Sequence, residues 1–117
     1  MQSTTSYRRG DIVLVDFVFT EGTGARRRPA LLLTSDTYNR GRQEAIVAAI
    51  TSNTDRLLVG DYLIAEWNTA GLRYPSVATG IIRTIKQWGI VRKLGSISPR
   101  DMTGVEASLR LSLDLAN

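Results

Sequence analysis

The chain has 117 residues, of which 43% are apolar and 22% charged, as expected for one globular domain with a single core. It contains no cysteine and no histidine, which excludes disulfides and histidine-based catalysis and disfavours a zinc site. Fifteen Lys and Arg residues against eleven Asp and Glu give a net charge of +4, and this excess favours a polyanionic partner.

Arginine accounts for 13 of the 15 basic residues. A guanidinium group offers planar, forked donors that match phosphate oxygens, and it stays charged at any physiological pH. Five basic residues and no acidic one stand between Arg83 and Arg100. A basic protein without an anionic partner is the alternative. No apolar stretch approaches the roughly 20 residues of a membrane helix, and residues 1–6 lack the core of a signal peptide, so we expect a cytoplasmic protein.

The chain begins with a segment, residues 1–8, that we expect to be flexible. Residues 11–19 (DIVLVDFVF) alternate in part and are rich in β-branched and aromatic side chains, which predicts a first strand. Residues 29–34 are apolar with little alternation. This pattern is typical of a central strand that is buried on both faces.

Three consecutive arginines, Arg26, Arg27 and Arg28, precede that second strand. The stretch Gly22-Thr23-Gly24-Ala25 predicts a flexible loop that carries this charge to the rim of the strand. Binding and catalytic groups often lie on a loop held by a rigid sheet. Two interpretations stay open here: a phosphate-binding cluster, or a solvated charge run that keeps a strand edge soluble.

The middle of the chain continues the strand pattern. Residues 35–41 predict a connection with one short helical turn, capped by Ser35 or Asp36. Residues 45–50 predict a third strand, residues 61–67 a fourth and residues 76–86 another, with Gly80 as a candidate bulge.

The last part of the chain is helical. Ser98 is an N-cap candidate, Pro99 suits the first helical position and Asp101 is the acid three residues after the cap. Apolar residues then recur at helical spacing, so we expect one amphipathic C-terminal helix over a core or dimer interface. With no repeat or linker, residues 1–117 form a single, mainly β domain, a compact and mostly antiparallel barrel closed by this helix.

Four segments resemble one family in order and spacing, the MazF/PemK-type toxins. They are Arg9-Gly10-Asp11-Ile12-Val13, Arg28-Pro29-Ala30-Leu31-Leu32-Leu33, Ile46-Val47-Ala48-Ala49-Ile50-Thr51-Ser52 and Ile82-Arg83-Thr84-Ile85. The resemblance implies a small SH3-like barrel of the CcdB/Kid type that forms homodimers. It implies a toxin that cuts single-stranded mRNA without a metal or other cofactor, and a cognate antitoxin that masks its cleft.

The resemblance also implies site residues. The arginine before proline and the threonine that ends the third strand are the family's catalytic pair, and they match Arg28 and Thr51. Metal-free RNA cleavage uses the neighbouring 2′-hydroxyl as nucleophile, so Arg28 would stabilise the negative charge that builds on the phosphate. Thr51 would contact the phosphate or orient that hydroxyl, or it would only satisfy a turn amide.

Further positions are expected to bind substrate. They are Thr23, Arg26, Arg27, Ser52, Arg83 and Thr84, the last two matching the family's Arg-Thr pair, which has a more structural role. The aromatic residues Tyr38, Trp67, Tyr74 and Trp88 can stack on bases. Burial in the core or in a dimer interface is the alternative for each.

The chain departs from the family pattern at Gly80, where several relatives carry an acid. Glu21 is the possible acid/base in its place, with Asp16 and Asp36 as substitutes. The departure also keeps two other functions open. One is a non-catalytic toxin of this fold that binds a protein target, as gyrase poisons do, although the C-terminus lacks the tryptophan of that type. The other is an RNA-binding module.

Overall fold

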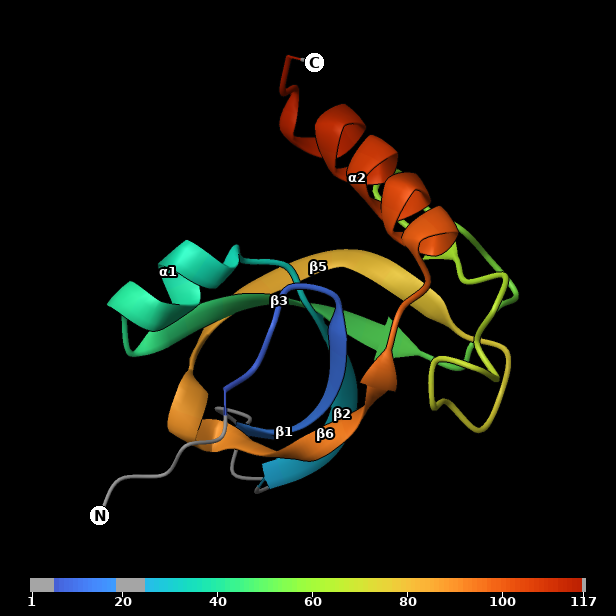
Figure 1. Cartoon of the computed structure of the whole chain (residues 1–117). Coiled ribbons are helices and arrows are strands. Elements are labelled where there is room, and N and C mark those ends of the chain that lie inside the picture. The colour runs from blue at the N-terminus through green and yellow to red at the C-terminus, as the bar shows by residue number, and fades with distance from the viewer. Residues whose placement is uncertain (1–5, 19–24, 117) are drawn as a thin grey trace.

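The computed structural model describes residues 6–18 and 25–116, and within them six strands form one antiparallel sheet (Figure 1). Its order is β4-β5-β3-β2-β1-β6. The strands are β1 (Asp11–Val18), β2 (Ala25–Leu32), β3 (Glu44–Thr51), β4 (Tyr62–Leu63), β5 (Val77–Lys86) and β6 (Ile90–Ser96). Between and after them stand α1 (Asp36–Gly41), the 3₁₀ turn η1 (Gln87–Gly89) and α2 (Pro99–Leu113).

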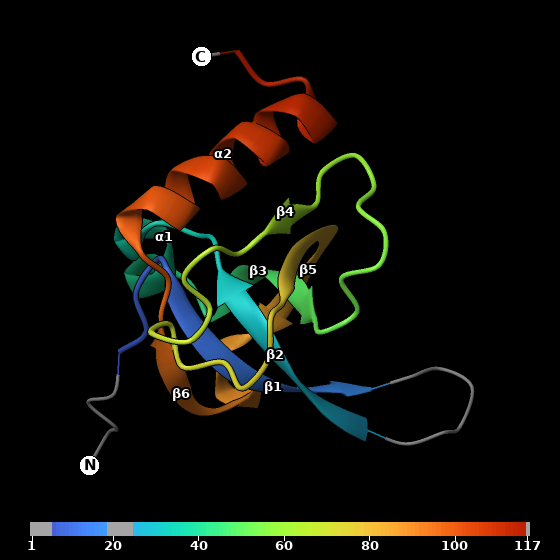
Figure 2. The ribbon, with the colours of Figure 1, turned by 90° about the vertical axis from the view of Figure 1, so that its right-hand side faces the viewer.

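The sheet curves strongly around an inner face, and α2 lies across its outside against β4 and β5 (Figures 1 and 2). The expected closure into a barrel is wrong for the described residues, because β4 and β6 are the two ends of the sheet and do not pair. Strand β4 has only two residues, both paired with β5, and its other edge meets no strand of the described chain. The mainly β fold with a C-terminal helix is confirmed.

Alternation along the strands builds two apolar clusters, one on each face of the sheet. On β1, Ile12 joins the cluster under α2, while Val13 and Val15 join the cluster on the other face. On β2, Leu31 joins the first cluster and its neighbours Ala30 and Leu32 join the second. Since β2 lies between β1 and β3, the predicted central strand buried on both faces is confirmed.

The bounds of β2 differ from the prediction in a way that matters for the site. The strand begins at Ala25, so Arg26, Arg27 and Arg28 lie within it and not in a loop before it. Pairing with β1 continues to Val18↔Ala25, and the two strands project together from the body of the sheet (Figure 2). Successive arginines therefore alternate between faces. Residues 22–24 of the expected loop lie outside the described residues.

In the second half of the chain one prediction is wrong and one strand was missed. The strand expected over residues 61–67 ends at Leu63, because the buried carboxylate of Asp101 accepts hydrogen bonds from the N–H groups of Ala65 and Glu66 and turns the chain onto α2. Strand β6 was not expected. It pairs with β1 through a register that shifts twice, and its sequence carries no clean alternation.

Both helix starts follow the expected local chemistry. The Ser35 hydroxyl accepts the N–H of Tyr38 at 3.1 Å, and the Ser98 hydroxyl accepts that of Asp101 at 3.1 Å. Each bond satisfies a backbone donor that the first helical turn leaves free.

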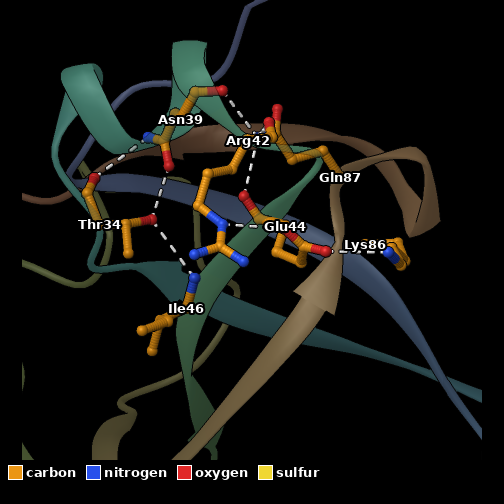
Figure 3. A network of polar contacts seen from close by, with 7 residues as sticks. All are labelled: Thr34, Asn39, Arg42, Glu44, Ile46, Lys86 and Gln87. Atoms are coloured by element: carbon orange, nitrogen blue, oxygen red, sulfur yellow. Dashed lines mark hydrogen bonds and ion pairs between the residues drawn. The ribbon is translucent and has the colours of Figure 1, made fainter.

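A polar network ties α1 to the start of β3 and the end of β5 (Figure 3). The side-chain amide of Gln87 donates to the carbonyl oxygens of Asn39 and Glu44, each at 2.8 Å. The Glu44 carboxylate accepts from Lys86 at 2.9 Å and from Arg42 at 3.0 Å, and these two hydrogen bonds lower its pKa to about 2. The network therefore joins α1 and the start of β3 to the end of β5.

The N-terminal segment is described from residue 6 onward, and residues 1–5 lie outside the description. Tyr7 packs against the second cluster, and the Arg8 N–H donates to Asp11 at 2.9 Å. Within the described residues, we find no helix with the length and apolar character needed to cross a membrane.

Candidate active site

The strand register brings Arg28 and Thr51 to the same place in the fold. Strands β2 and β3 pair from Leu32↔Val47 to Ala30↔Ala49. Arg28 is two residues beyond Ala30 and Thr51 is two residues beyond Ala49, so both continue this register on the same face. The two side chains lie where the paired part of β2 and β3 ends.

A groove of about 870 Å³ opens at this point, and both side chains line it. Its walls come from β1, β2, the end of β3, the loop before β5, β5 itself and β6. The polar and charged side chains among its lining residues are Arg28, Thr51, Ser52, Arg73, Tyr74, Ser76, Thr79, Arg83 and Arg92.

The charge of the groove is of one sign. Four guanidinium groups line it, from Arg28, Arg73, Arg83 and Arg92, and the lining contains no Asp or Glu among the described residues. In that part of the chain none of the four takes part in an ion pair. Unpaired cations in one concavity attract and orient an anion, and forked donors suit a phosphodiester.

Two local contacts orient groups in the groove. The guanidinium of Arg83 lies over the Phe17 ring, 5.4 Å from its centre, so a cation–π contact holds it in place while its edge stays free for a ligand. The Thr51 hydroxyl accepts the N–H of Asn53 at 3.1 Å. This is the turn contact expected as the alternative role for Thr51, and it leaves the hydroxyl hydrogen available to a phosphate oxygen.

Comparison with known proteins agrees with this geometry. Residues 8–113 match the family described as the PemK-like, MazF-like toxin of type II toxin–antitoxin systems. The chain belongs to the PemK/MazF toxin family. It is 31% identical over 112 residues to the endoribonuclease MazF of Staphylococcus epidermidis, an alignment that covers 94% of this chain and 93% of the relative.

Solved structures of low sequence identity share the fold. An endoribonuclease from Mycobacterial species superposes with a TM-score of 0.78 at 17% identity, covering 99% of each chain. An endoribonuclease in complex with its cognate antitoxin, also from Mycobacterial species, gives 0.75 at 20% identity, with 96% of this chain and 99% of that chain covered.

The other arginines of the triplet are placed differently from Arg28. Arg27 lies on the opposite face, where its Nε donates to the Asp16 carboxylate at 3.0 Å. Arg26 is exposed, and it is not among the lining residues. Thr84 is likewise exposed beside Arg83 but outside the lining. Only one arginine of the triplet therefore reaches the groove.

The acids considered at the sequence level do not lie in the described groove. Asp16 is engaged with Arg27, and the Asp36 carboxylate accepts the Arg9 N–H at 3.2 Å. Both are absent from the lining. Glu21 and Thr23 lie outside the described residues, so the structure does not place them.

The glycine at position 80 has a packing reason in this chain. Its N–H donates to the Asp61 carboxylate at 2.8 Å, and a β-carbon there would meet the backbone of Val59 and Gly60 at 3.2 Å. The 57–60 segment thus occupies the space that the side chain of an acid would need.

Sequence reasoning missed Arg73 as a groove residue and noted Arg92 only as part of a basic stretch. No local pattern marks them, because their place in the same groove as Arg28 and Thr51 depends on how the 71–76 loop and β6 meet. Gly71, at φ +93°, allows this meeting, because a β-carbon there would collide with the Leu94 carbonyl group.

Among the aromatic candidates, only Tyr74 lines the groove, and its side chain is 62% exposed. Trp67 packs against the cluster under α2, and Tyr38 lies under the Arg42 guanidinium. Trp88 is 80% exposed on η1, outside the lining. The expectation that aromatic residues stack on bases therefore remains a prediction for Tyr74.

Proposed function

We propose that this protein is a toxin that cuts single-stranded RNA at selected sequences without a metal ion, using a ribose 2′-hydroxyl as nucleophile. The observation that carries the proposal is that Arg28 and Thr51 line the same groove, together with three further arginines and, among the described residues, no acid. Relatives about 30% identical over most of the chain are named endoribonucleases.

In the proposed reaction the 2′-oxygen attacks the adjacent phosphorus, and the bond from phosphorus to the 5′-oxygen of the next nucleotide breaks. The products are a 2′,3′-cyclic phosphate and a 5′-hydroxyl, to which the proton returns. Arg28 donates to the non-bridging oxygens as their negative charge grows, and the Thr51 hydroxyl donates a further hydrogen bond. A donor of this kind typically contributes about 3–4 kcal/mol to transition-state stabilisation.

Charge stabilisation is the main catalytic device in this proposal. The Arg28 guanidinium is a poor base, because an arginine side chain does not give up its proton in proteins. The described lining has no carboxylate to act as a base, so the arginines must make up for its absence by stabilising the phosphorane-like state. Glu21 remains our acid/base candidate from the β1–β2 connection.

We propose that the bound RNA extends beyond the groove along the projecting part of β2. We assign phosphate contacts to Arg83 and Ser52 within the groove and to Arg26 and Arg27 on the projecting part of β2. Thr23 stays a proposed contact from the family resemblance alone, and Thr84 supports Arg83. Each contact to phosphate adds affinity that falls as salt rises.

Partners follow from the family. We propose that the protein acts in the cytoplasm as a homodimer and is inhibited by a cognate antitoxin that covers the groove. A fold neighbour was solved in complex with its cognate antitoxin. We also assign the curved sheet to the SH3-like class, as a barrel left open between β4 and β6.

The test is cleavage of a long single-stranded RNA by the purified protein in EDTA, with analysis of the fragment ends. We expect discrete fragments with cyclic-phosphate or 3′-phosphate ends. Arg28→Ala and Thr51→Ala should abolish or greatly slow the reaction, while Arg110→Ala, on α2 and outside the groove lining, serves as the matched control.

Intact RNA after long incubation would refute the nuclease proposal. If the protein bound RNA without cutting it, and this binding weakened as salt rose, the result would favour an RNA-binding module over a nuclease. Trapped gyrase–DNA complexes with intact RNA would favour the protein-targeting toxin. Cutting that survives both substitutions would show that another protein or another site is responsible.

A further inference from the structure

A second hollow, of about 340 Å³, adjoins the groove. Ser52, Thr54, Tyr74 and Pro75 line it, and two of these, Ser52 and Tyr74, also line the groove. Tyr74 therefore stands between the two hollows, and Ser52 follows the proposed catalytic Thr51 directly in the chain. The volume is near the lower end of small-molecule sites, which span about 300–1,000 Å³.

The backbone on the Tyr74 side of this hollow is held firmly. The Tyr74 carbonyl oxygen accepts the hydroxyl of Ser76 at 2.8 Å, and Ser76 is 4% exposed. The Ser76 carbonyl oxygen in turn accepts the N–H of Ile64 at 3.0 Å. Pro75 restricts Tyr74 to extended backbone. An exposed ring on a fixed backbone is prepared for a ligand without a large ordering cost.

The opposite side is a short turn fixed by its own side chains. The N–H of Asn53 donates to the Thr51 hydroxyl and that of Asp55 donates to the Asn53 side-chain oxygen, both at 3.1 Å. In the described part of the chain, the hydroxyls of Ser52 and Thr54 have no hydrogen-bond partner. Each can donate to and accept from a ligand.

An exposed aromatic ring beside a cationic groove is the usual arrangement for a stacked base. We propose that this hollow is a base subsite: the base of a nucleotide next to the scissile phosphate stacks on Tyr74, and the hydroxyls of Ser52 and Thr54 contact its edge. The inference rests on the proposed function, and it assigns part of the sequence preference to the 52–54 turn.

The experiment measures cleavage kinetics and base preference together. Wild type and variants cut an RNA pool randomised around one cut site, and the fragment ends are sequenced. Stacking on an aromatic side chain is sensitive to its removal, so we expect Tyr74→Ala to raise KM by about 5- to 150-fold with a smaller change in kcat. Tyr74→Phe keeps the ring and should restore the KM.

Two further variants test the proposed hydrogen bonds from the Ser52 and Thr54 hydroxyls to the base. Ser52→Ala and Thr54→Val should flatten the base preference at one position beside the cut and leave the other positions unchanged. Trp88→Ala removes a more exposed aromatic side chain outside the groove lining, and it should behave as wild type. Thermal melting of each variant serves as the control that the fold is kept.

A binding measurement separates failure of this subsite from failure of the proposed function. The probe is the same single-stranded RNA with a 2′-deoxy nucleotide at the cut, which cannot react. Loss of affinity in Tyr74→Ala supports the subsite whether or not the wild type cleaves. Unchanged affinity, KM and base preference in the Tyr74 and Thr54 variants would overturn it, even if Arg28-dependent cleavage is intact.

Discussion

Removing the carboxylate of Asp101 should unfold the protein at a much lower temperature. This side chain is 0% exposed, and it accepts three hydrogen bonds: from the Tyr62 hydroxyl at 2.6 Å and from the N–H groups of Ala65 and Glu66 at 3.0 and 2.8 Å. It joins the first turn of α2 to the segment that leads to the groove wall.

The expected loss follows from these contacts. A hydrogen bond to a charged group contributes about 1.5–3 kcal/mol, and a buried donor left without a partner costs a similar amount. The lower end applies here, because Ala65 and Glu66 are exposed residues and because burying the charge has its own cost. We expect Asp101→Ala to lower the free energy of unfolding by about 3–4 kcal/mol.

At about 4 °C per kcal/mol for a domain of this size, Tm should fall by about 12–16 °C. Asp101→Asn keeps the shape of the side chain but turns an amide donor toward a backbone N–H. We expect it to lower the free energy of unfolding by about half as much as Asp101→Ala. Glu106→Gln is the matched control on α2. It breaks only a half-exposed ion pair with Arg9, and such pairs contribute at most about 1 kcal/mol.

Urea and thermal unfolding followed by circular dichroism provide the measurement. Burial by itself raises the pKa of Asp101, but the hydrogen bonds from Tyr62, Glu66 and Ala65 outweigh it, so the pKa lies below its ordinary 3.8. The charged Asp101 carboxylate therefore stabilises the fold above pH 3.8, and this stabilisation is lost as the pH falls through the lowered pKa. An Asp101→Ala variant within about 1 kcal/mol of wild type would refute the assigned role of the carboxylate.

Three more predictions concern the groove and the helix. Arg73→Ala and Arg92→Ala should each reduce the salt dependence of binding to uncleavable single-stranded RNA, by about 0.7 in the slope of log K against log salt; unchanged slopes would remove them from the phosphate contacts. Gly104→Ala should lower the free energy of unfolding by about 1–3 kcal/mol despite better helix propensity, because its β-carbon would overlap the Tyr62 ring. Gly89→Ala, with no atom within 4 Å of its β-carbon, should be nearly neutral in the same melts. Burial, and after it the hydrogen bond to Asp101, raises the pKa of Tyr62 from 10.0 to about 12, so wild type should lose stability as the pH rises through that range. The Tyr62→Phe variant should lack this alkaline loss, and an identical profile would contradict the assignment.

Much of the fold could be predicted because its signals are local. The caps at Ser35 and Ser98 each bond a backbone N–H three residues ahead, so chain neighbours alone decide where a helix starts. The β-branched run at the start of β1 and the apolar run in β2 likewise lie in strands, although β2 begins four residues before the predicted bound. Motifs in sequence order were also enough to place the chain in its family.

Predictions failed where a distant contact overrides the local pattern. The alternation over residues 61–67 favours a strand, but Asp101, some 35 residues away, captures the N–H groups that the strand would use. The triplet of arginines looks uniform in sequence. In the structure the pleat separates Arg27, paired with Asp16, from Arg28, which reaches the groove.

The sequence by itself determined the helix starts and the apolar faces of the central strands. It also singled out Arg28 and Thr51 as the proposed catalytic pair. Only the tertiary structure decided that Arg73, Tyr74 and Arg92 join them around one groove. The physical reason is the separation along the chain over which each interaction acts. Caps and alternation act within a few residues, whereas the groove forms where the sheet curvature and the close approach at Gly71 bring distant backbone segments together.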